Sequence, residues 1–366
     1  MVEDHGHMTA ALALASRGLG RVAPNPAVGC VLVRDGIVVG RGWTQPGGRP
    51  HAETEALARA GAAARGATAY VTLEPCAHRG QTPPCAEALV DSGIARCVVA
   101  IEDPDPRVAG RGLAKLREAG VEVSVGLLAD EAERVNAGFL KRIRTGRPLV
   151  LLKLATTLDG RIATHGGESR WITGSAARQF GHMLRRRYDA IMVGSGTVLA
   201  DDPELSVRLP GLGGSQPLRI VVDGRLRTPL TAKFVQQAAD HPSLVLTLAG
   251  GDKLRHQAFV DCGVKVIELP PDEDGNIDLA AALDALGQLG LTRVLVEGGA
   301  TLAASLLRRQ LVDRLAWFRS ASLIGGDGIP AVKPFGVDRL AEQARGIRLG
   351  VMRIGEDLLE TFDLRA

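Results

Sequence analysis

Apolar and polar positions follow two patterns along the first 140 residues or so. Apolar residues spaced about 3.6 positions apart predict helices at residues 8–19, 52–64, 84–92 and 111–119, and another from about 129. Apolar runs rich in Val and Ile predict strands at residues 28–42, 67–73, 96–101 and 121–126. Residues 28–42 contain two strands that turn at Asp35 and Gly36. Helices and strands therefore alternate, as in a three-layer α/β domain.

The alternation starts again in the second half of the chain. Short apolar runs predict strands at residues 148–155, 189–194, 218–223, 243–248, 264–269 and 293–298. Helical stretches such as 278–289 and 299–309 lie between them. The basic segment KRIRTGRP, residues 141–148, separates the halves, and its Gly and Pro end the preceding helix. We therefore predict two α/β domains, residues 1–146 and 147–366.

Composition and charge narrow the choice of partner. A chain of 366 residues is long for one domain, and its 45% apolar content is typical of globular proteins. The formal net charge is only +3 and no Lys/Arg block resembles a nucleic-acid-binding tail, so a nucleic-acid partner is not expected. No secretory leader or apolar run of about 18 residues is present, which favours a cytoplasmic protein without a membrane partner. We expect a small-molecule substrate, and homo-oligomerisation stays open.

Two short stretches, HAETEAL at 51–57 and LEPCAHRGQTPPC at 73–85, carry candidate chemistry. His51 opens a predicted helix, Cys76 follows a predicted strand, and Cys85 opens another helix. One imidazole and two thiolates are a zinc ligand set that leaves a fourth position for water, as catalytic zinc sites do. Helix N-termini help to hold cysteines as thiolates. We therefore predict a catalytic zinc site at these three residues.

Glu53 follows His51 by two residues, and we predict that it is the general acid/base and not a ligand. A carboxylate beside a zinc-bound water can carry protons between that water and the substrate. Read separately, an H-x-E stretch can be an ordinary solvated helix start, and cysteines beside strands are commonly buried apolar residues. The combination of all four residues favours the metal site. Cys30, Cys97 and Cys262 are expected to be small buried apolar residues.

These residues resemble the zinc-dependent cytidine-deaminase-like fold, whose signature is H-x-E followed by P-C-x-x-C. Here eight residues, and not two, separate Cys76 from Cys85. This long loop and the stretch PNPAVGCVLV at 24–33 resemble the bifunctional riboflavin-biosynthesis family, in which a diaminopyrimidine deaminase is joined to a reductase. The resemblance implies deamination at C2 of 2,5-diamino-6-ribosylamino-4(3H)-pyrimidinone 5′-phosphate. It also implies that four residues contact this substrate: Asn25, Val28, His78 and Thr82. Gln81 stands where the family generally has Lys or Arg, and Arg79 is an alternative phosphate contact.

The second half resembles the reductase domain of the same family, whose fold is similar to dihydrofolate reductase. Three ordered stretches carry the resemblance: 153–174, 194–208 and 296–307. It implies NADPH-dependent reduction of the ribosyl group to a ribityl chain, assisted at C1′ by Lys153. The implied cofactor contacts are Ala155, Trp171, Thr197, Asp201 and Gly299. The implied substrate contacts are Ser169, Arg185, Leu205, Arg208 and Glu297, with both arginines suited to the 5′-phosphate.

Two other interpretations compete with this one. A nucleoside or nucleic-acid deaminase fused to an unrelated nucleotide-binding domain would account for the zinc residues, but it predicts a short cysteine spacing and leaves the second half unexplained. A structural zinc module would need a closed set of four ligands, and His78 would have to be the fourth. No G-x-G-x-x-G stretch occurs at a strand-to-helix turn, so an ordinary Rossmann domain is not predicted.

Overall fold

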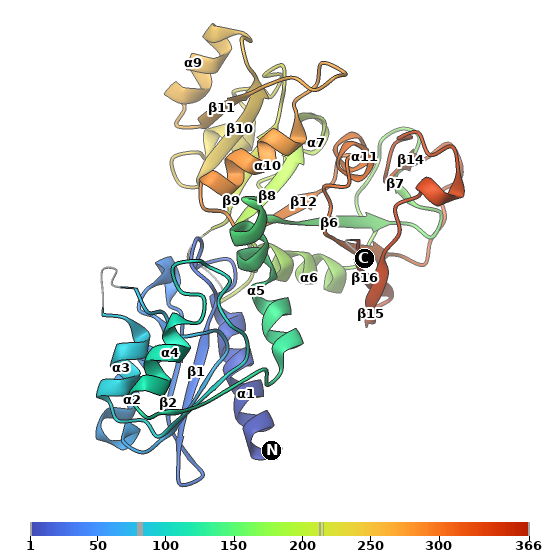
Figure 1. Cartoon of the computed structure of the whole chain (residues 1–366). Coiled ribbons are helices and arrows are strands. Elements are labelled where there is room, and N and C mark those ends of the chain that lie inside the picture. Colours follow the sequence, from blue (N-terminus) through green and yellow to red (C-terminus); the bar gives the residue numbers. More distant parts are fainter. Residues whose placement is uncertain (1, 79–82, 212–213, 215, 365–366) are drawn as a thin grey trace. The chain divides into compact units, whose positions relative to one another are not determined.

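The computed structural model describes residues 2–78, 83–211, 214 and 216–364 (Figure 1). The chain divides into two compact units, Met1–Arg147 and Pro148–Ala366. The sequence predicts the boundary between the two domains one residue earlier, after Gly146. No helix in the described part of the chain is long and apolar enough to cross a membrane.

Unit 1 contains a five-stranded sheet in the order β2-β1-β3-β4-β5. Its strands are β1 (Gly29–Arg34), β2 (Ile37–Trp43), β3 (Thr68–Val71), β4 (Arg96–Val99) and β5 (Glu122–Val125). The first two form the predicted hairpin, with Asp35 and Gly36 in the left-handed conformation that its turn requires. The β1 strand pairs antiparallel with β2 and β3, whereas β3, β4 and β5 are parallel. Loops that leave the carboxyl ends of β3 and β4 therefore meet at one edge of the sheet.

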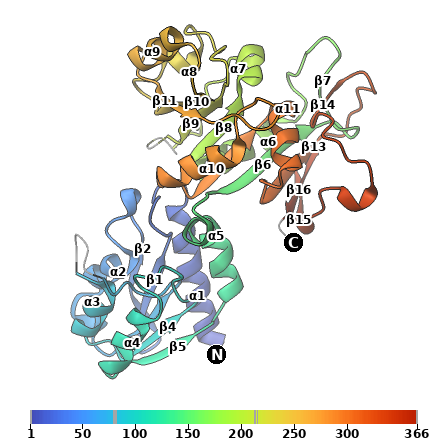
Figure 2. The same cartoon turned by 45° about the horizontal axis from the view of Figure 1, so that its top comes forward.

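Helices cover both faces of this sheet, which confirms the three-layer prediction. They are α1 (Val2–Ala15), α2 (Ala52–Ala60), α3 (Cys85–Asp91), α4 (Arg111–Glu118) and α5 (Ala129–Thr145). Helices α1 and α5 lie on one face, and α2, α3 and α4 lie on the other (Figures 1 and 2). The first helix begins six residues before the predicted start, and Glu3 and Asp4 in its first turn favour that start through the helix dipole.

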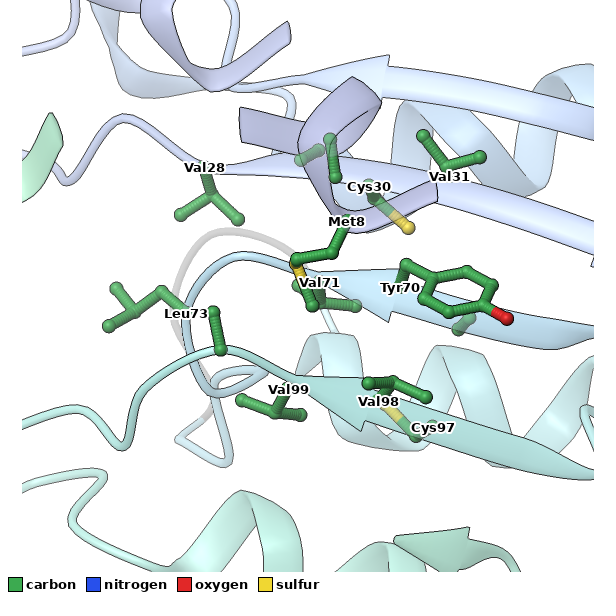
Figure 3. Close-up of a cluster of buried hydrophobic side chains, with 14 of the residues drawn as sticks. Met8, Val28, Cys30, Val31, Tyr70, Val71, Leu73, Cys97, Val98 and Val99 are labelled. Carbon is green, nitrogen blue, oxygen red and sulfur yellow. The ribbon is translucent and has the colours of Figure 1, made fainter. Parts of the chain in front are cut away.

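The core of unit 1 joins α1 to the central strands (Figure 3). Met8 from α1 packs against side chains of β1, β3 and β4, and these strands carry long apolar runs because both faces are covered. Cys30 and Cys97 are fully buried in this core, as expected. Cys262, in unit 2, is only partly buried, so its expected burial was wrong; it lies at the end of a helix whose preceding residue, Asp261, is exposed.

Unit 2 contains a nine-stranded sheet in the order β11-β10-β9-β8-β12-β6-β13-β16-β15 and a two-stranded sheet of β7 and β14. The strands are β6 (Leu149–Thr156), β7 (Arg161–Ala163), β8 (Ala190–Gly194), β9 (Leu218–Val222), β10 (Ser243–Leu248), β11 (Lys265–Leu269), β12 (Arg293–Glu297), β13 (Arg314–Arg319), β14 (Ile329–Pro330), β15 (Ile347–Ile354) and β16 (Asp357–Asp363). Neighbours from β11 to β13 are parallel, and β16 and β15 extend the sheet antiparallel.

Six helices accompany this sheet within the described residues. They are α6 (Ser175–Arg186), α7 (Ser195–Asp201), α8 (Lys233–Gln236), α9 (Lys253–Asp261), α10 (Leu279–Gln288) and α11 (Ala300–Arg308). Alternate residues of β8 enter two separate cores: Ala190 and Met192 pack with α10 and α11, while Ile191 and Val193 pack with α7, α8 and α9. This period of two shows that both faces of the sheet are buried, as in other α/β folds.

Candidate active sites

One nitrogen and two sulfurs converge at the first candidate site, in unit 1. His51 is the extended residue before α2, Cys76 lies in the loop after β3, and Cys85 is the first residue of α3. Their ligand atoms all lie within 4.8 Å of one another. The Nδ1 atom of His51 is 3.3 Å from Sγ of Cys85 and 3.6 Å from Sγ of Cys76. The structure therefore specifies Nδ1 as the ring nitrogen that faces the sulfurs.

These separations fit a tetrahedral zinc ion. Bonds of about 2.0 Å to nitrogen and 2.3 Å to sulfur place the two atoms about 3.5 Å apart at a tetrahedral angle. The two observed N···S distances lie on either side of that value. Three protein ligands leave one position for water, which is the arrangement of catalytic zinc sites.

The pKa values of the ionisable side chains in and beside this cluster are strongly shifted. Hydrogen bonds from the thiol of Cys85 and from His51 lower the pKa of Cys76 to about 4, against the opposing effect of burial. The pKa of the Cys85 thiol is raised, mainly by its hydrogen bond to Cys76 and then by burial. Glu53 is buried in the first turn of α2, and burial together with the charge of Cys76 raises the pKa of its carboxyl to about 7. A carboxyl that titrates near neutral pH can both accept and donate a proton.

The predicted substrate contacts of unit 1 are placed differently from one another. The side chain of Asn25 lies against Gly48, where an added Cβ would be 1.7 Å from Nδ2. Val28 is buried in the core, and its backbone exchanges hydrogen bonds with Thr44 (Figure 3). His78 is half-buried, and its Nδ1 atom has no hydrogen-bond partner among the described residues. Thr82, like Arg79 and Gln81, lies outside the described residues.

Sequence reasoning assigned no role to three buried acidic residues near the cysteines: Glu74, Asp103 and Asp105. Burial raises the pKa of Asp103 to about 6, and the charges of Asp105 and Glu74 add to this shift. Hydrogen bonds from Arg107 lower the pKa of Asp105. The sequence did contain a signal, because Asp103 and Asp105 lie within about four residues after a predicted strand and Glu74 directly follows another.

The second candidate site lies at the carboxyl ends of neighbouring parallel strands in unit 2. Lys153 on β6 is paired in register with Glu297 on β12. Arg185 on α6 donates two hydrogen bonds to Glu297, from Nε at 2.7 Å and from Nη2 at 2.8 Å. Its Nη1 donates to the carbonyl of Ser206 at 2.8 Å. The guanidinium of Arg185 is therefore occupied by protein groups in this structure.

Two largely buried charges, Arg185 and Glu297, and one aromatic ring lie near Lys153. Burial lowers the pKa of Lys153, and the cation of Arg185 lowers it further, while Glu297 opposes the shift. Burial alone would raise the pKa of Glu297, but Arg185 and Lys153 outweigh it and hold the value at about 2. The ammonium of Lys153 lies 5.5 Å from the ring centroid of Phe318, and no hydrogen bond to it is found in the described part of the chain. It is thus available to a bound molecule.

Three predicted cofactor residues gather beside this group. Ala155 lies two residues beyond Lys153 on β6. Thr197 belongs to α7, directly after β8, and Gly299 precedes α11, directly after β12. The Oγ1 of Thr197 is 3.3 Å from the position that a Cβ on Gly299 would take. Because β6, β12 and β8 are adjacent, their carboxyl ends form one continuous edge, where α/β sheets usually bind ligands.

Three more predicted residues lie on exposed loops and helix ends. Trp171 is 69% exposed, and the guanidinium of Arg178 is 4.4 Å from its ring centroid. Asp201 ends α7, and its carbonyl accepts a hydrogen bond from Arg170 at 3.0 Å. Ser169, two residues before Trp171, is partly buried.

The remaining two predicted residues follow α7. Leu205 is buried, with a positive φ of 52°. Arg208 has a side chain that is 53% exposed and forms an ion pair with Glu204. Its backbone N–H donates to Nδ1 of His182 on α6 at 3.3 Å. His182 was not recognised from the sequence, because only the fold brings α6 to this loop.

Comparison with known proteins covers both units. Residues 1–101 match the cytidine and deoxycytidylate deaminase zinc-binding region, and residues 148–359 match the RibD C-terminal domain. The riboflavin biosynthesis protein RibD of Escherichia coli is 41% identical over 98% of both chains, and that of Aquifex aeolicus is 40% identical over 98% of both. Among solved structures, the RibD of Acinetobacter baumannii has a TM-score of 0.89 at 40% identity, covering 100% of this chain and 99% of that one. A diaminohydroxyphosphoribosylaminopyrimidine deaminase/5-amino-6-(5-phosphoribosylamino)uracil reductase from Thermotoga maritima has a TM-score of 0.85 at 32% identity, covering 99% of each.

Proposed function

The chain belongs to the RibD family of bifunctional riboflavin-biosynthesis enzymes, and on that premise we propose a residue-level account of its deaminase and reductase reactions. Unit 1 removes the C2 amine of 2,5-diamino-6-ribosylamino-4(3H)-pyrimidinone 5′-phosphate by hydrolysis. Unit 2 then reduces the ribosyl group, using NADPH, to give 5-amino-6-ribitylamino-uracil 5′-phosphate. The observation that carries the proposal is the convergence of His51, Cys76 and Cys85 beside the buried Glu53.

In the deaminase, His51, Cys76 and Cys85 would hold zinc, which would supply an activated water at neutral pH. Glu53 accepts one proton from the attacking water and passes it to the pyrimidine ring; it then carries a second proton, from the newly attached hydroxyl, to the amine, which leaves as ammonia. The burial that raises its pKa to about 7 suits this double role. Asn25 and the backbone at Val28 shape the pyrimidine site, because an amide can pair with the edge of a heterocycle. His78 and Thr82 complete the contacts to substrate.

In the reductase, NADPH supplies the hydride, and the chain positions both reactants. Lys153 donates a proton to the ring oxygen of the sugar as its bond to C1′ opens, while C1′ receives the hydride; the lowered pKa of Lys153 favours this donation. Glu297 stays ionised and keeps the ammonium at the carboxyl end of β6. The cofactor contacts are Ala155, Trp171, Thr197, Asp201 and Gly299. Ser169, Leu205, Arg208, Glu297 and Arg185 face the substrate.

The 5′-phosphate in the reductase site is bound mainly by Arg208. The sequence suggested both arginines, but the fork of Arg185 is engaged by Glu297 and Ser206. Arg208 is half exposed, and its pairing with Glu204 is a surface ion pair that a phosphate can displace at small cost. Arg185 contributes positive charge and the orientation of Glu297.

Both reactions act on a small molecule, and we place them in the cytoplasm without a nucleic-acid or membrane partner. A nucleoside or nucleic-acid deaminase fused to an unrelated domain is not supported, because relatives of one family match nearly the whole chain. A structural zinc module lacks support as well, since the cluster contains three candidate ligands and Glu53 lies beside them.

The deciding experiment is reconstitution of the full chain with zinc and the diaminopyrimidine substrate. Ammonia should be released without NADPH, and NADPH should be oxidised only after deamination. Metal analysis should give one zinc per chain. Ammonia release that needs NADPH, or deamination of cytidine in preference to the ribotide, would contradict the proposal.

A further inference from the structure

Glu74 is the acidic residue that best connects the deaminase site to a neighbouring loop. Its carboxylate is buried and accepts four backbone N–H groups. The Oε2 atom accepts from Asp103 at 3.2 Å and from Gly110 at 3.0 Å. The Oε1 atom accepts from Gly112 at 2.8 Å and from Leu113 at 3.3 Å. One carboxylate therefore fixes both ends of the loop at residues 103–110 and the start of α4.

The same contact joins this loop to the backbone that carries a predicted metal ligand. Glu74 and Pro75 directly precede Cys76, and the N–H of Glu74 donates to the carbonyl of Ile101 at 3.0 Å. Gly112 packs so closely on this segment that an added Cβ would lie 2.0 Å from the carbonyl oxygen of Pro75. The position of α4 is thus determined jointly by the charge of Glu74 and by the absence of a side chain at Gly112.

The loop at residues 103–110 follows β4, which is the parallel neighbour of β3, so it starts beside the loop that carries Cys76 and His78. Within it, Asp103 Oδ1 accepts the N–H of Asp105 at 2.9 Å, and Arg107 pairs with Asp105 at 2.5 Å. Asp105 interacts electrostatically with His78, whose Nδ1 atom is buried without a partner among the described residues. His51 directly precedes α2, Glu53 lies in its first turn and Cys85 opens α3, whereas Cys76 lies in the loop after β3. The loop at residues 103–110 therefore shares this sheet edge with a predicted substrate contact, His78.

We propose that Glu74 is a positioning residue for the deaminase reaction, which holds the loop at residues 103–110 in place against His78 and so sets the affinity for substrate. The inference rests on the deaminase function proposed above. Glu74 needs to contact neither substrate nor metal for this role. An amide at this position would turn an NH2 donor toward backbone N–H donors, so Glu74→Gln removes the attraction while keeping the shape.

The test is steady-state deamination by full-length Glu74→Gln, loaded with zinc. We expect KM for the diaminopyrimidine substrate to rise about tenfold, because loss of charge-assisted hydrogen bonds disturbs substrate contacts, with kcat within about twofold of the parent. Zinc content should stay at one per chain. Reduction of the deaminated intermediate should be unchanged. Glu87→Gln is the matched control: Glu87 pairs with Lys115 between α3 and α4, and its loss should leave KM unchanged.

Gly112→Ala supplies a second route to the same effect. It keeps the carboxylate but forces α4 away from Pro75, so KM should rise again at constant zinc content. This variant decides the question if Glu74→Gln does not fold. A lower melting temperature with the parent KM would show a purely structural role and overturn the proposal, as would loss of zinc or a fall in kcat at constant KM. A parent enzyme that does not deaminate would instead overturn the proposed function, which separates the two failures.

Discussion

Glu53 in unit 1 is buried and Glu297 in unit 2 is largely buried, both at a candidate site, yet the pKa values of their carboxyls are shifted in opposite directions. Burial and the nearby Cys76 charge raise the pKa of Glu53 to about 7. Arg185 and Lys153 overcome burial and lower that of Glu297 to about 2. The partner, and not burial itself, decides which carboxyl can exchange a proton and which remains a fixed charge. Substitutions at either carboxyl, or at the cation beside Glu297, test this contrast.

Glu53→Gln should have the largest effect. Because an amide cannot carry the proton, deamination should fall by on the order of 10³-fold. Zinc content and reduction of the deaminated intermediate should not change, since Glu53 is not assigned as a ligand. Metal analysis and ammonia release measure both quantities. Zinc lost from the variant would show that Glu53 is a ligand and would remove the contrast with Glu297.

Glu297→Gln should destabilise unit 2 by about 3 kcal/mol at neutral pH, because it leaves Arg185 buried without its anion. The pKa of Glu297 is lowered on folding, so its contribution is fully present above the unfolded value of 4.5 and disappears as the pH falls through about 2. Denaturant unfolding of parent and variant from pH 7 to pH 2 should therefore show converging stabilities. A difference that is constant across this range would contradict the assigned charge state.

Lys153→Ala should lower the rate of reduction by about a hundredfold while deamination continues, so the deaminated pyrimidine accumulates. Reduction falls because Ala cannot supply the ammonium that Lys153 places beside Glu297. Deamination continues because its site belongs to the other unit. NADPH oxidation and product chromatography measure the two steps. Loss of deamination in a folded variant would show that the two sites are not independent.

The smallest effect concerns the cofactor. We expect kcat/KM to be about tenfold higher with NADPH than with NADH, because contacts to one additional phosphate are lost with NADH. The exposed Arg170, whose Nη2 donates a hydrogen bond to the carbonyl of Asp201, is a candidate contact for this additional phosphate. If it contacts that phosphate, Arg170→Ala should reduce the preference without affecting deamination. Equal efficiency of the parent with both cofactors would remove the expectation.

The two sites also differ in how far the sequence could predict them. His51, Glu53, Cys76 and Cys85 lie close together in the chain, at helix starts or, for Cys76, just after a strand, so local patterns were sufficient to propose that they meet. The contact between Arg185 and Glu297 joins residues 112 positions apart, and it depends on how α6 packs against the sheet. No local pattern reports such packing. The role of Glu74 depends on similarly distant partners, such as Asp103 and Gly110, so its position before Pro75 and Cys76 did not reveal it.

The fold shows a similar limit. The strands from β1 to β12 that were predicted carry apolar runs, because both faces of the sheets are covered. No strand was predicted after residue 298, where β13, β15 and β16 complete the sheet. In β15 all residues but Ile354 are exposed, and in β13 arginines stand at both ends. Such strands are recognised by their pairing partners more than by their own composition.

The place of β12 in the sheet has a consequence for synthesis on the ribosome. This strand lies between β6 and β8 but follows both by about a hundred residues or more in the chain. A nascent chain that ends before residue 293 can complete unit 1, whereas the centre of the second sheet still lacks a strand. Domains generally fold in order as they emerge. Premature termination in this region would therefore yield a product that deaminates but releases its intermediate unreduced.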